Sequence, residues 1–160
     1  MRYSVTGTDM QTSAVADTYE TMLALIAADT AGHRARLLSL AVGIADDAPG
    51  DLQLAVSLQR VDDVSAGGVG TPGASPTPVP KDSQAIASVV TAGDGPYTAE
   101  PTTYGDPIWE IELNRRDGFI KEWAPEDAPI INRDQLLGVL CAPRTGAACQ
   151  VTITMEFEVY

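Results

Sequence analysis

The sequence predicts an all-β fold, an antiparallel β-sandwich of about eight strands with one long loop rich in glycine and proline. Apolar residues recur at every second position in several separate stretches, which is the period of a strand with one buried face. Clusters of Gly, Pro, Asp and Asn separate these stretches, and no segment longer than Thr18–Ala28 shows a helical pattern. About eight strands in two sheets indicate a jelly-roll-like arrangement.

The N-terminal residues 1–15 are predicted to form a short strand or an arm, because residues 1–11 include β-branched and aromatic types. Residues Thr18–Ala28 match both a helical stripe and a strand. Their alanine content favours a helix, but the strands that follow favour a strand, which we predict. Residues Thr30–His33 are predicted to turn, and His33 is expected to be an exposed turn residue rather than a catalytic one.

Residues Arg34–Arg60 contain the clearest pattern, two alternating runs joined by the turn-forming residues Asp46–Asp51. In the first run the large apolar residues occupy even positions, namely Leu38, Leu40, Val42 and Ile44. The second run has the same parity, with Leu52, Leu54, Val56 and Leu58. Each run predicts a half-buried strand, and together they predict an antiparallel sheet.

Residues Val61–Pro80 contain four glycines and four prolines. This density sustains neither a strand ladder nor a helix, so we predict a long loop outside the sheets. A loop of this length in a compact domain is usually functional or disordered. The glycines at Gly67–Gly70 are not a phosphate cradle, because prolines follow them instead of Lys-Ser/Thr and a helix.

A strand is predicted next at Gln84–Thr91, and Ala92–Pro107 is rich in turn-forming residues. Residues Trp109–Asn114 and Phe119–Trp123 flank a turn of polar residues and Gly118, so they predict a hairpin.

Two strands are predicted in the C-terminal part of the chain. Residues Gln135–Cys141 are nearly all apolar, which indicates a buried strand. The final strand has one apolar face, formed by Val151, Ile153, Met155, Phe157 and Val159. Threonines and glutamates form its other face, so this strand is predicted to cover the core on one side only.

Length and charge narrow the class of protein. At 160 residues the chain is expected to form one domain, residues 1–160, around a single core. Its net charge of −12 repels phosphate backbones and anionic lipids, so we expect a protein partner rather than nucleic acid or a membrane surface. Residues 1–6 lack the basic flank and apolar core of a secretory signal, and we expect synthesis in a cytoplasm.

The two cysteines, Cys141 and Cys149, flank a connection that resembles a hairpin turn. Cysteines facing each other on adjacent strands could form a disulfide, but free thiols are favoured in a large chain made in a reducing compartment. A tetrahedral zinc site needs four ligands, and the single histidine, His33, is far away in sequence. No metal is therefore expected.

Paired carboxylates recur along the chain, and solvated strand faces or turns explain them better than a catalytic cleft does. These pairs are Asp46/Asp47, Asp62/Asp63, Glu110/Glu112, Glu126/Asp127 and Glu156/Glu158. Neither a Gly-x-Ser-x-Gly elbow nor a cysteine beside a base is present, so no nucleophilic triad can be assembled. We predict no catalytic, cofactor-binding or metal-binding residue, and no enzymatic activity.

Three further side chains have two possible roles. Arg115 and Arg116 are a basic pair in an acidic chain, and an intramolecular partner is favoured over a partner protein. Trp109 is assigned to the core. Trp123, which precedes Ala124-Pro125 at a strand end, fits a core cap and an interface anchor equally well.

Six segments follow one another in a characteristic order. They are Thr21–Leu25, Arg36–Gly43, Leu52–Arg60, Thr77–Asp82, Glu122–Pro125 and the terminal strand at Val151–Glu158. In this order the segments resemble small structural proteins of tailed-phage virions, namely head decoration, or cement, proteins with a jelly-roll fold.

This resemblance implies a protein that binds the outer capsid lattice and stabilises the head. It implies the major capsid protein as partner, a homo-oligomer, most often a trimer, and a place on the capsid exterior. It implies no active residues and no cofactor. The Val61–Pro80 loop and the N-terminal arm are the expected contact elements, because a partner would satisfy backbone groups that they cannot satisfy alone.

Two alternatives remain. A tail or other minor virion component on the same fold fits the sequence, and so does a carbohydrate-binding jelly-roll module. The second alternative requires exposed aromatic side chains on a concave face, and the chain has only nine Phe, Trp and Tyr residues.

Overall fold

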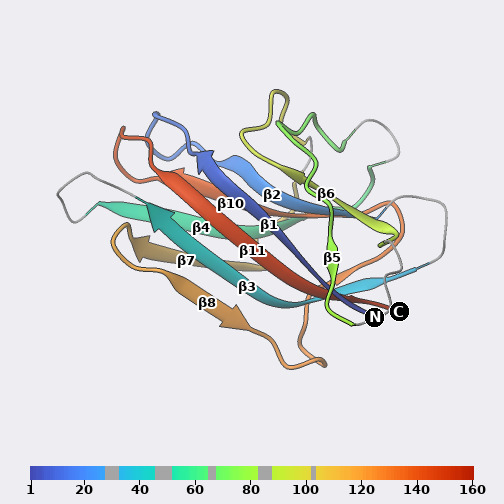
Figure 1. Ribbon diagram of the computed structural model, residues 1–160. Helices are drawn as coiled ribbons and strands as arrows, with labels where there is room; N and C mark the ends of the chain where they lie inside the picture. The colour runs from blue at the N-terminus through green and yellow to red at the C-terminus, as the bar shows by residue number, and fades with distance from the viewer. Residues whose placement is uncertain (28–32, 46–51, 65–67, 83–87, 102–103) are drawn as a thin grey trace.

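The computed structural model describes residues 1–27, 33–45, 52–64, 68–82, 88–101 and 104–160. Within these residues the chain forms eleven strands and no helix. The strands make two antiparallel sheets that pack face to face (Figure 1). The predicted all-β class and the β-sandwich are confirmed.

Sheet A contains six of the strands. Their order is β5 (Val79–Pro80), β1 (Arg2–Gln11), β11 (Gln150–Val159), β3 (Ala35–Ala45) and β8 (Phe119–Glu122), and β9 (Ile130–Ile131) also pairs with β3. Sheet B contains five. Their order is β6 (Val90–Asp94), β2 (Glu20–Ala27), β10 (Leu136–Pro143), β4 (Gln53–Val61) and β7 (Trp109–Asn114).

Most consecutive strands lie in different sheets, which corrects three expectations. β3 and β4 are both strands but do not share a sheet, β7 and β8 are not a hairpin, and β10 and β11 are not a hairpin either. A period of two shows which face of a strand is buried but does not name its neighbour. In each of these pairs one strand belongs to sheet A and the other to sheet B.

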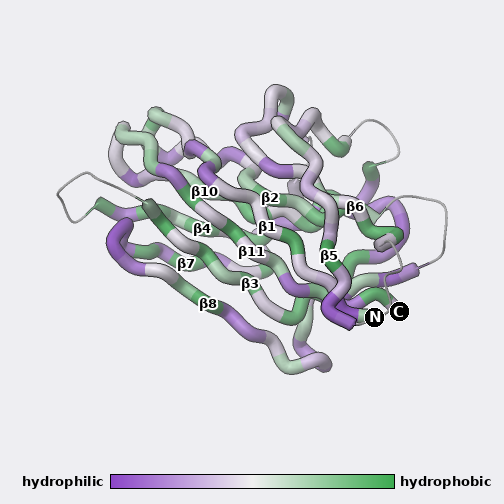
Figure 2. Tube along the Cα trace, viewed as in Figure 1, coloured by the Kyte–Doolittle hydropathy of each residue, from purple (hydrophilic) through white to green (hydrophobic). Residues whose placement is uncertain are grey.

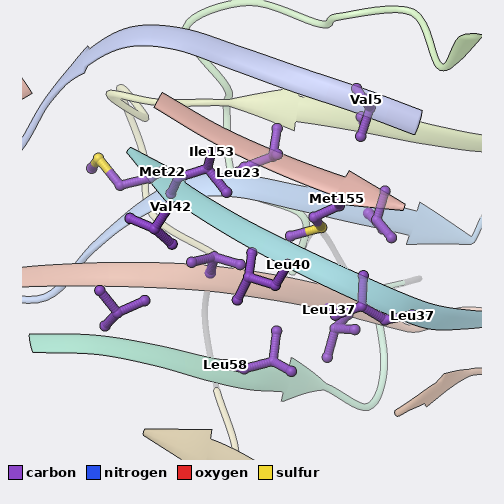
Figure 3. Close-up of a cluster of buried hydrophobic side chains, with 14 of the residues drawn as sticks. Val5, Met22, Leu23, Leu37, Leu40, Val42, Leu58, Leu137, Ile153 and Met155 are labelled. Atoms are coloured by element: carbon purple, nitrogen blue, oxygen red, sulfur yellow. The ribbon is translucent and has the colours of Figure 1, made fainter. Parts of the chain in front are cut away.

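The core lies between the two sheets. Leu40, Val42, Ile153 and Met155 project from sheet A toward Leu23, Leu58 and Leu137 of sheet B, as Figure 3 shows. Hydrophobic residues follow the strands, whereas hydrophilic residues gather in connections such as the β7–β8 turn (Figure 2). The sandwich therefore forms because each strand places its apolar face in this gap.

A bulge in β3 shifts the predicted buried face. β11 pairs Glu156 with Ser39 and Phe157 with Leu37, which leaves Leu38 as the extra residue. Beyond the bulge, Leu37 is fully buried and Leu38 is only half-buried. The expectation that Leu38 belongs to the core face is wrong, because an inserted residue reverses the alternation.

β4 also departs from the prediction, because it is buried on both faces. Ala55 and Ser57, expected on the open side, have no exposed surface. The same holds for its neighbour β10, whose residues are all buried as expected. Other parts of the chain must cover the outer face of sheet B.

The remaining segments agree in part with the secondary structure predicted from the sequence. The strand predicted in Thr18–Ala28 is confirmed as β2, and the final strand is confirmed as β11. β6 begins at Val90, so the predicted Gln84–Thr91 strand is displaced toward the C-terminus and the first residues of Ala92–Pro107 are strand. The turns expected at 30–32 and 46–51, and residues 84–87, lie outside the described residues.

Candidate interaction surfaces

The N-terminal segment is part of the sandwich. Residues 2–11 form β1, which pairs with β11 on one side and with β5 on the other. Tyr3 is buried and stacks on Phe157 with ring centroids 5.5 Å apart. The strand alternative is therefore confirmed for residues 2–11, which are not an arm free to reach a partner, since β11 pairs along the strand and β5 pairs at Tyr3 and Ser4.

The glycine- and proline-rich segment also bonds within the chain. The Val64 amide donates to the Asp134 carbonyl at 2.8 Å, and the Thr71 amide donates to Ala99 at 2.7 Å. Gly73 donates to Asp94, and Val79–Pro80 adds a two-residue ladder to β1. The prediction that this backbone needs a partner protein is therefore wrong for the described part of Val61–Pro80, because it forms these hydrogen bonds within the chain.

Two covering segments lie against the outer face of sheet B: residues 12–19, and the described residues of 62–74 and 95–108, which precede β5 and follow β6. The second of them builds a small hydrophobic cluster on the outer face of the sheet. Its buried members are Ala24, Val61, Val64, Tyr97 and Leu136, with Ile26, Val69 and Tyr104 packed around them. A Cβ at Gly138 would overlap the Tyr104 hydroxyl, so the ring lies directly on the strand at a residue that has no side chain.

A polar cluster fixes this cover to β2. The Thr21 amide donates to both carboxylate oxygens of Glu100, at 3.1 and 3.0 Å, and its hydroxyl bonds the same carboxylate. The hydroxyls of Thr21 and Tyr104 lie 2.9 Å apart. Burial raises the pKa of the Tyr104 phenol far above its usual value, so it stays protonated and able to donate.

Residues 12–19 are tied to the other end of the same face. Arg144 lies between Asp17, at 2.8 Å, and Glu112, at 2.7 Å. The Tyr19 hydroxyl donates to Glu110 of β7. Burial and then this carboxylate raise the pKa of Tyr19 to about 12. The Glu110/Glu112 pair is thus exposed as expected, but each carboxylate has a partner in the chain.

The outer face of sheet A is open, as the front layer in Figure 1 shows. Its side chains alternate with the core residues and are small or hydroxylated at most positions, with a few carboxylates: Ser4, Thr6, Ser39, Ala41, Gly43, Thr152, Thr154 and Glu156, with Ile120 and Glu122 on β8. Ile120 is 69% exposed, the largest value among the exposed large hydrophobic residues of the described chain. This open face is a broad surface that a partner can reach.

One hollow of about 280 Å³ interrupts the open face near β8. It is lined by Arg2, Leu38, Ser39, Glu122, Trp123, Pro125 and Glu156. Trp123 also packs against the core and meets the edge of Trp109 at 6.3 Å between centroids. Trp123 therefore caps the core while part of it borders the hollow, and Trp109 packs on the core as predicted.

Arg115 and Arg116, the basic pair, lie in different environments. Arg115 is only 2% exposed, and its guanidinium donates to the Ala147 carbonyl. Its amide donates to Leu52 at 3.0 Å, so it joins three connections at one end of the sandwich. The intramolecular interpretation is confirmed for Arg115, whereas Arg116 is exposed.

The two cysteines are free and buried, in agreement with the favoured prediction. Thr12 accepts from the Cys149 amide at 3.0 Å, which ties the residue after β1 to the start of β11. Burial raises the pKa of the Cys141 thiol far above its usual value. Both thiols belong to the hydrophobic core between the sheets.

The remaining acidic residues and the histidine do not converge on a site. Glu156 pairs with Lys81, Glu158 pairs with Arg36, and Asp62 accepts from Gln135 at 3.0 Å. Glu126, Asp127 and His33 are exposed, and Asp46/Asp47 lie outside the described residues. In the part of the chain that the structure describes, no three His, Cys, Asp or Glu side chains are grouped as metal ligands would be.

No protein-family model matches the sequence, and no curated protein matches it either. No helix in the described ranges is long and apolar enough to span a membrane.

Proposed function

We propose that this protein is a structural component of a tailed-phage virion, a decoration protein that binds the outer capsid lattice and stabilises the head. The observation that carries the proposal is the order of strands. β1, β11, β3 and β8 face β2, β10, β4 and β7, and this order supports the jelly-roll arrangement on which the resemblance rests.

The open face of sheet A supports a role in binding a large surface. It is a twisted sheet face that the described covering segments leave free, and Ile120 stands out from it. The N-terminal strand and the glycine- and proline-rich segment have their own partners, so the proposed contact with the major capsid protein moves from them to this face.

A homotrimer on the capsid exterior is the assembly that we propose. Three copies that each make modest contacts bind a symmetric lattice far more tightly than one copy does, because the later contacts are intramolecular. The protein would be made in the host cytoplasm and act in the virion. A tail or other minor virion component is the alternative within the same class.

The test combines the mass in solution with binding to an undecorated phage shell. Light scattering is expected to give a trimer, and the protein is expected to co-sediment with the shell. Ile120→Asp, on the open face, should weaken co-sedimentation roughly tenfold or more, because a charge would replace an apolar contact. Val15→Asp is the matched control, since Val15 is 63% exposed but lies in a covering segment.

A monomer that stays in the supernatant would contradict the decoration role and favour the tail alternative. Equal loss of binding in both variants would contradict the assignment of the open face.

A further inference from the structure

The hollow on the open face, called the Trp123 hollow below, has a polar floor. The register of four neighbouring strands brings the residues of this floor together. Ser4 pairs with Glu156, Glu156 with Ser39, and Ser39 with Glu122, so these four residues form one row across β1, β11, β3 and β8. Neighbouring strands are about 4.8 Å apart, which separates the two glutamates by roughly 10 Å along the row. The small Ser39 between them leaves the depression.

The hollow has an apolar wall beside this floor. Leu38 reaches it because the bulge in β3 turns that side chain away from the core. The Trp123 amide donates to the Leu38 carbonyl at 3.0 Å, which places the backbone of Trp123 beside Leu38, and both residues line the hollow. Trp109 packs edge-on against the Trp123 ring, with the centroids 6.3 Å apart, which supports the indole from the core side.

The charges around the hollow nearly cancel. Arg2 supplies a guanidinium, Glu122 supplies a carboxylate, and Glu156 is already paired with Lys81. Neither the Arg2 guanidinium nor the Glu122 carboxylate makes an ion pair with another residue that the structure describes. Arg2 would repel a cationic ligand that Glu122 attracts, and the reverse holds for an anionic ligand, so the hollow gives neither charge a net preference.

A neutral ligand with hydroxyl groups fits all three features. Each hydroxyl can donate to Glu122 and accept from Arg2 or Ser39. A ring with an apolar C–H face can rest on the indole and Leu38, as an amphipathic site of this kind requires. The volume of about 280 Å³ suits a single ring with its substituents.

We propose that the Trp123 hollow binds a neutral sugar ring, a pyranose unit of a glycan. This goes beyond the capsid-binding function and does not depend on it. Because the hollow lies on the face that we assign to the capsid contact, a glycan and the capsid lattice would compete for this face. Glu122 accepts from two hydroxyls in this arrangement, while Trp123 supports the ring.

The test uses an array of neutral and anionic glycans, followed by calorimetry with the strongest neutral glycan. Wild-type protein is expected to bind neutral glycans only. Glu122→Gln should weaken binding roughly tenfold, because hydrogen bonds to a charged acceptor are stronger than neutral ones. Glu126→Gln is the matched control, since Glu126 is exposed near the hollow but does not line it, and its affinity should not change.

Trp123→Ala should abolish binding, with the fold checked by a two-dimensional amide spectrum, because Trp123 also packs on the core. The Trp123 indole signal of wild type should shift when the glycan is added. Absence of neutral glycan binding, binding to anionic glycans alone, or equal affinities for Glu122→Gln and wild type would overturn the proposal. Co-sedimentation with the shell is measured separately, so failure of the glycan site and failure of capsid binding remain distinguishable.

Discussion

The central strands of the two sheets, β10 and β11, follow each other in the chain but differ in what lies on their outer faces. All eight residues of β10 are buried, whereas β11 alternates between buried and half-buried positions. Tyr104 and the cluster around Leu136 cover β10. On β11 the outward threonines and glutamates remain at the surface.

This difference assigns separate roles to the two outer faces. The covered face of sheet B acts as a second small core and contributes to folding. The open face of sheet A is expected to contribute little to stability, and it is the face to which we assign the proposed contact with a partner. Substitutions matched across the two faces therefore test the assignment.

The largest contrast is expected between Leu136→Ala and Ile120→Ala. Leu136 has no exposed surface in the outer cluster of sheet B, so its truncation should lower the free energy of unfolding by about 2–5 kcal/mol. Ile120 is 69% exposed on the open face, and its truncation should change stability by less than about 1 kcal/mol. Urea unfolding measures both values. Similar losses would show that the open face is covered in solution.

A smaller contrast separates Thr21→Val from Thr154→Val. The Thr21 hydroxyl bonds Glu100 and Tyr104 at a fully buried position, so its loss should cost about 1–3 kcal/mol. The Thr154 hydroxyl bonds only Thr6, at the surface, and its loss should cost less than about 0.5 kcal/mol. Thermal unfolding of the two variants under one condition provides the comparison. Equal melting temperatures would argue against a stabilising polar cluster.

The smallest effect concerns pH. The pKa of Tyr19 is raised from 10.0 to about 12 in the fold, so the protonated phenol is the stabilised form. Its contribution is present below pH 10 and is lost as the pH rises toward 12. Tyr19→Phe should lower stability by less than about 1 kcal/mol below pH 10, because the bond to Glu110 is partly exposed.

The stability difference between Tyr19→Phe and wild type should therefore shrink between pH 10 and pH 12. Using the difference removes the effect of Tyr97 and Tyr104, whose pKa values are also raised and which titrate in both proteins. A difference that stays constant across this range would contradict the role of the Tyr19 bond.

The sequence predicts faces and strands well because burial leaves a direct trace in the residue pattern. The continuous apolar run of β10 and the strict alternation of β11 already distinguish a doubly buried strand from a half-buried one. The burial of β4 on both faces could not be predicted in this way, because Ala55 and Ser57 are small residues that are also common on exposed strand faces. Their burial depends on a cover that comes from distant segments.

Strand partners could not be predicted, because short turn-rich connections fit both a hairpin and a crossing between sheets. The β7–β8 connection follows Asn114 and contains Arg, Asp and Gly, as a hairpin turn would, yet it joins two sheets. The bulge at Leu38 was hidden for a similar reason. An extra residue in one strand leaves no mark unless its partner strand is known.

The candidate sites were hard to predict for the same reason, because they combine residues that are far apart in the sequence. The carboxylate pairs were expected on solvated faces, and Glu110 and Glu112 are exposed, but their partners Tyr19 and Arg144 are far away in sequence. The Trp123 hollow combines residues from β1, β3, β8 and β11. Only the Trp-Ala-Pro sequence at the end of β8 hinted at it.

Two glycines test the central comparison most directly, because each sits on the outer face of a strand. At Gly138, on the covered face, an added Cβ would overlap Tyr104, whereas at Gly43, on the open face, it would lie 3.8 Å from the nearest atom. Gly138→Ala should destabilise the protein by about 1–3 kcal/mol. Gly43→Ala should be neutral or stabilise it by up to about 1 kcal/mol. Measured together by urea unfolding, a clear loss for Gly138→Ala alone supports the account, and equal effects at both glycines would contradict it.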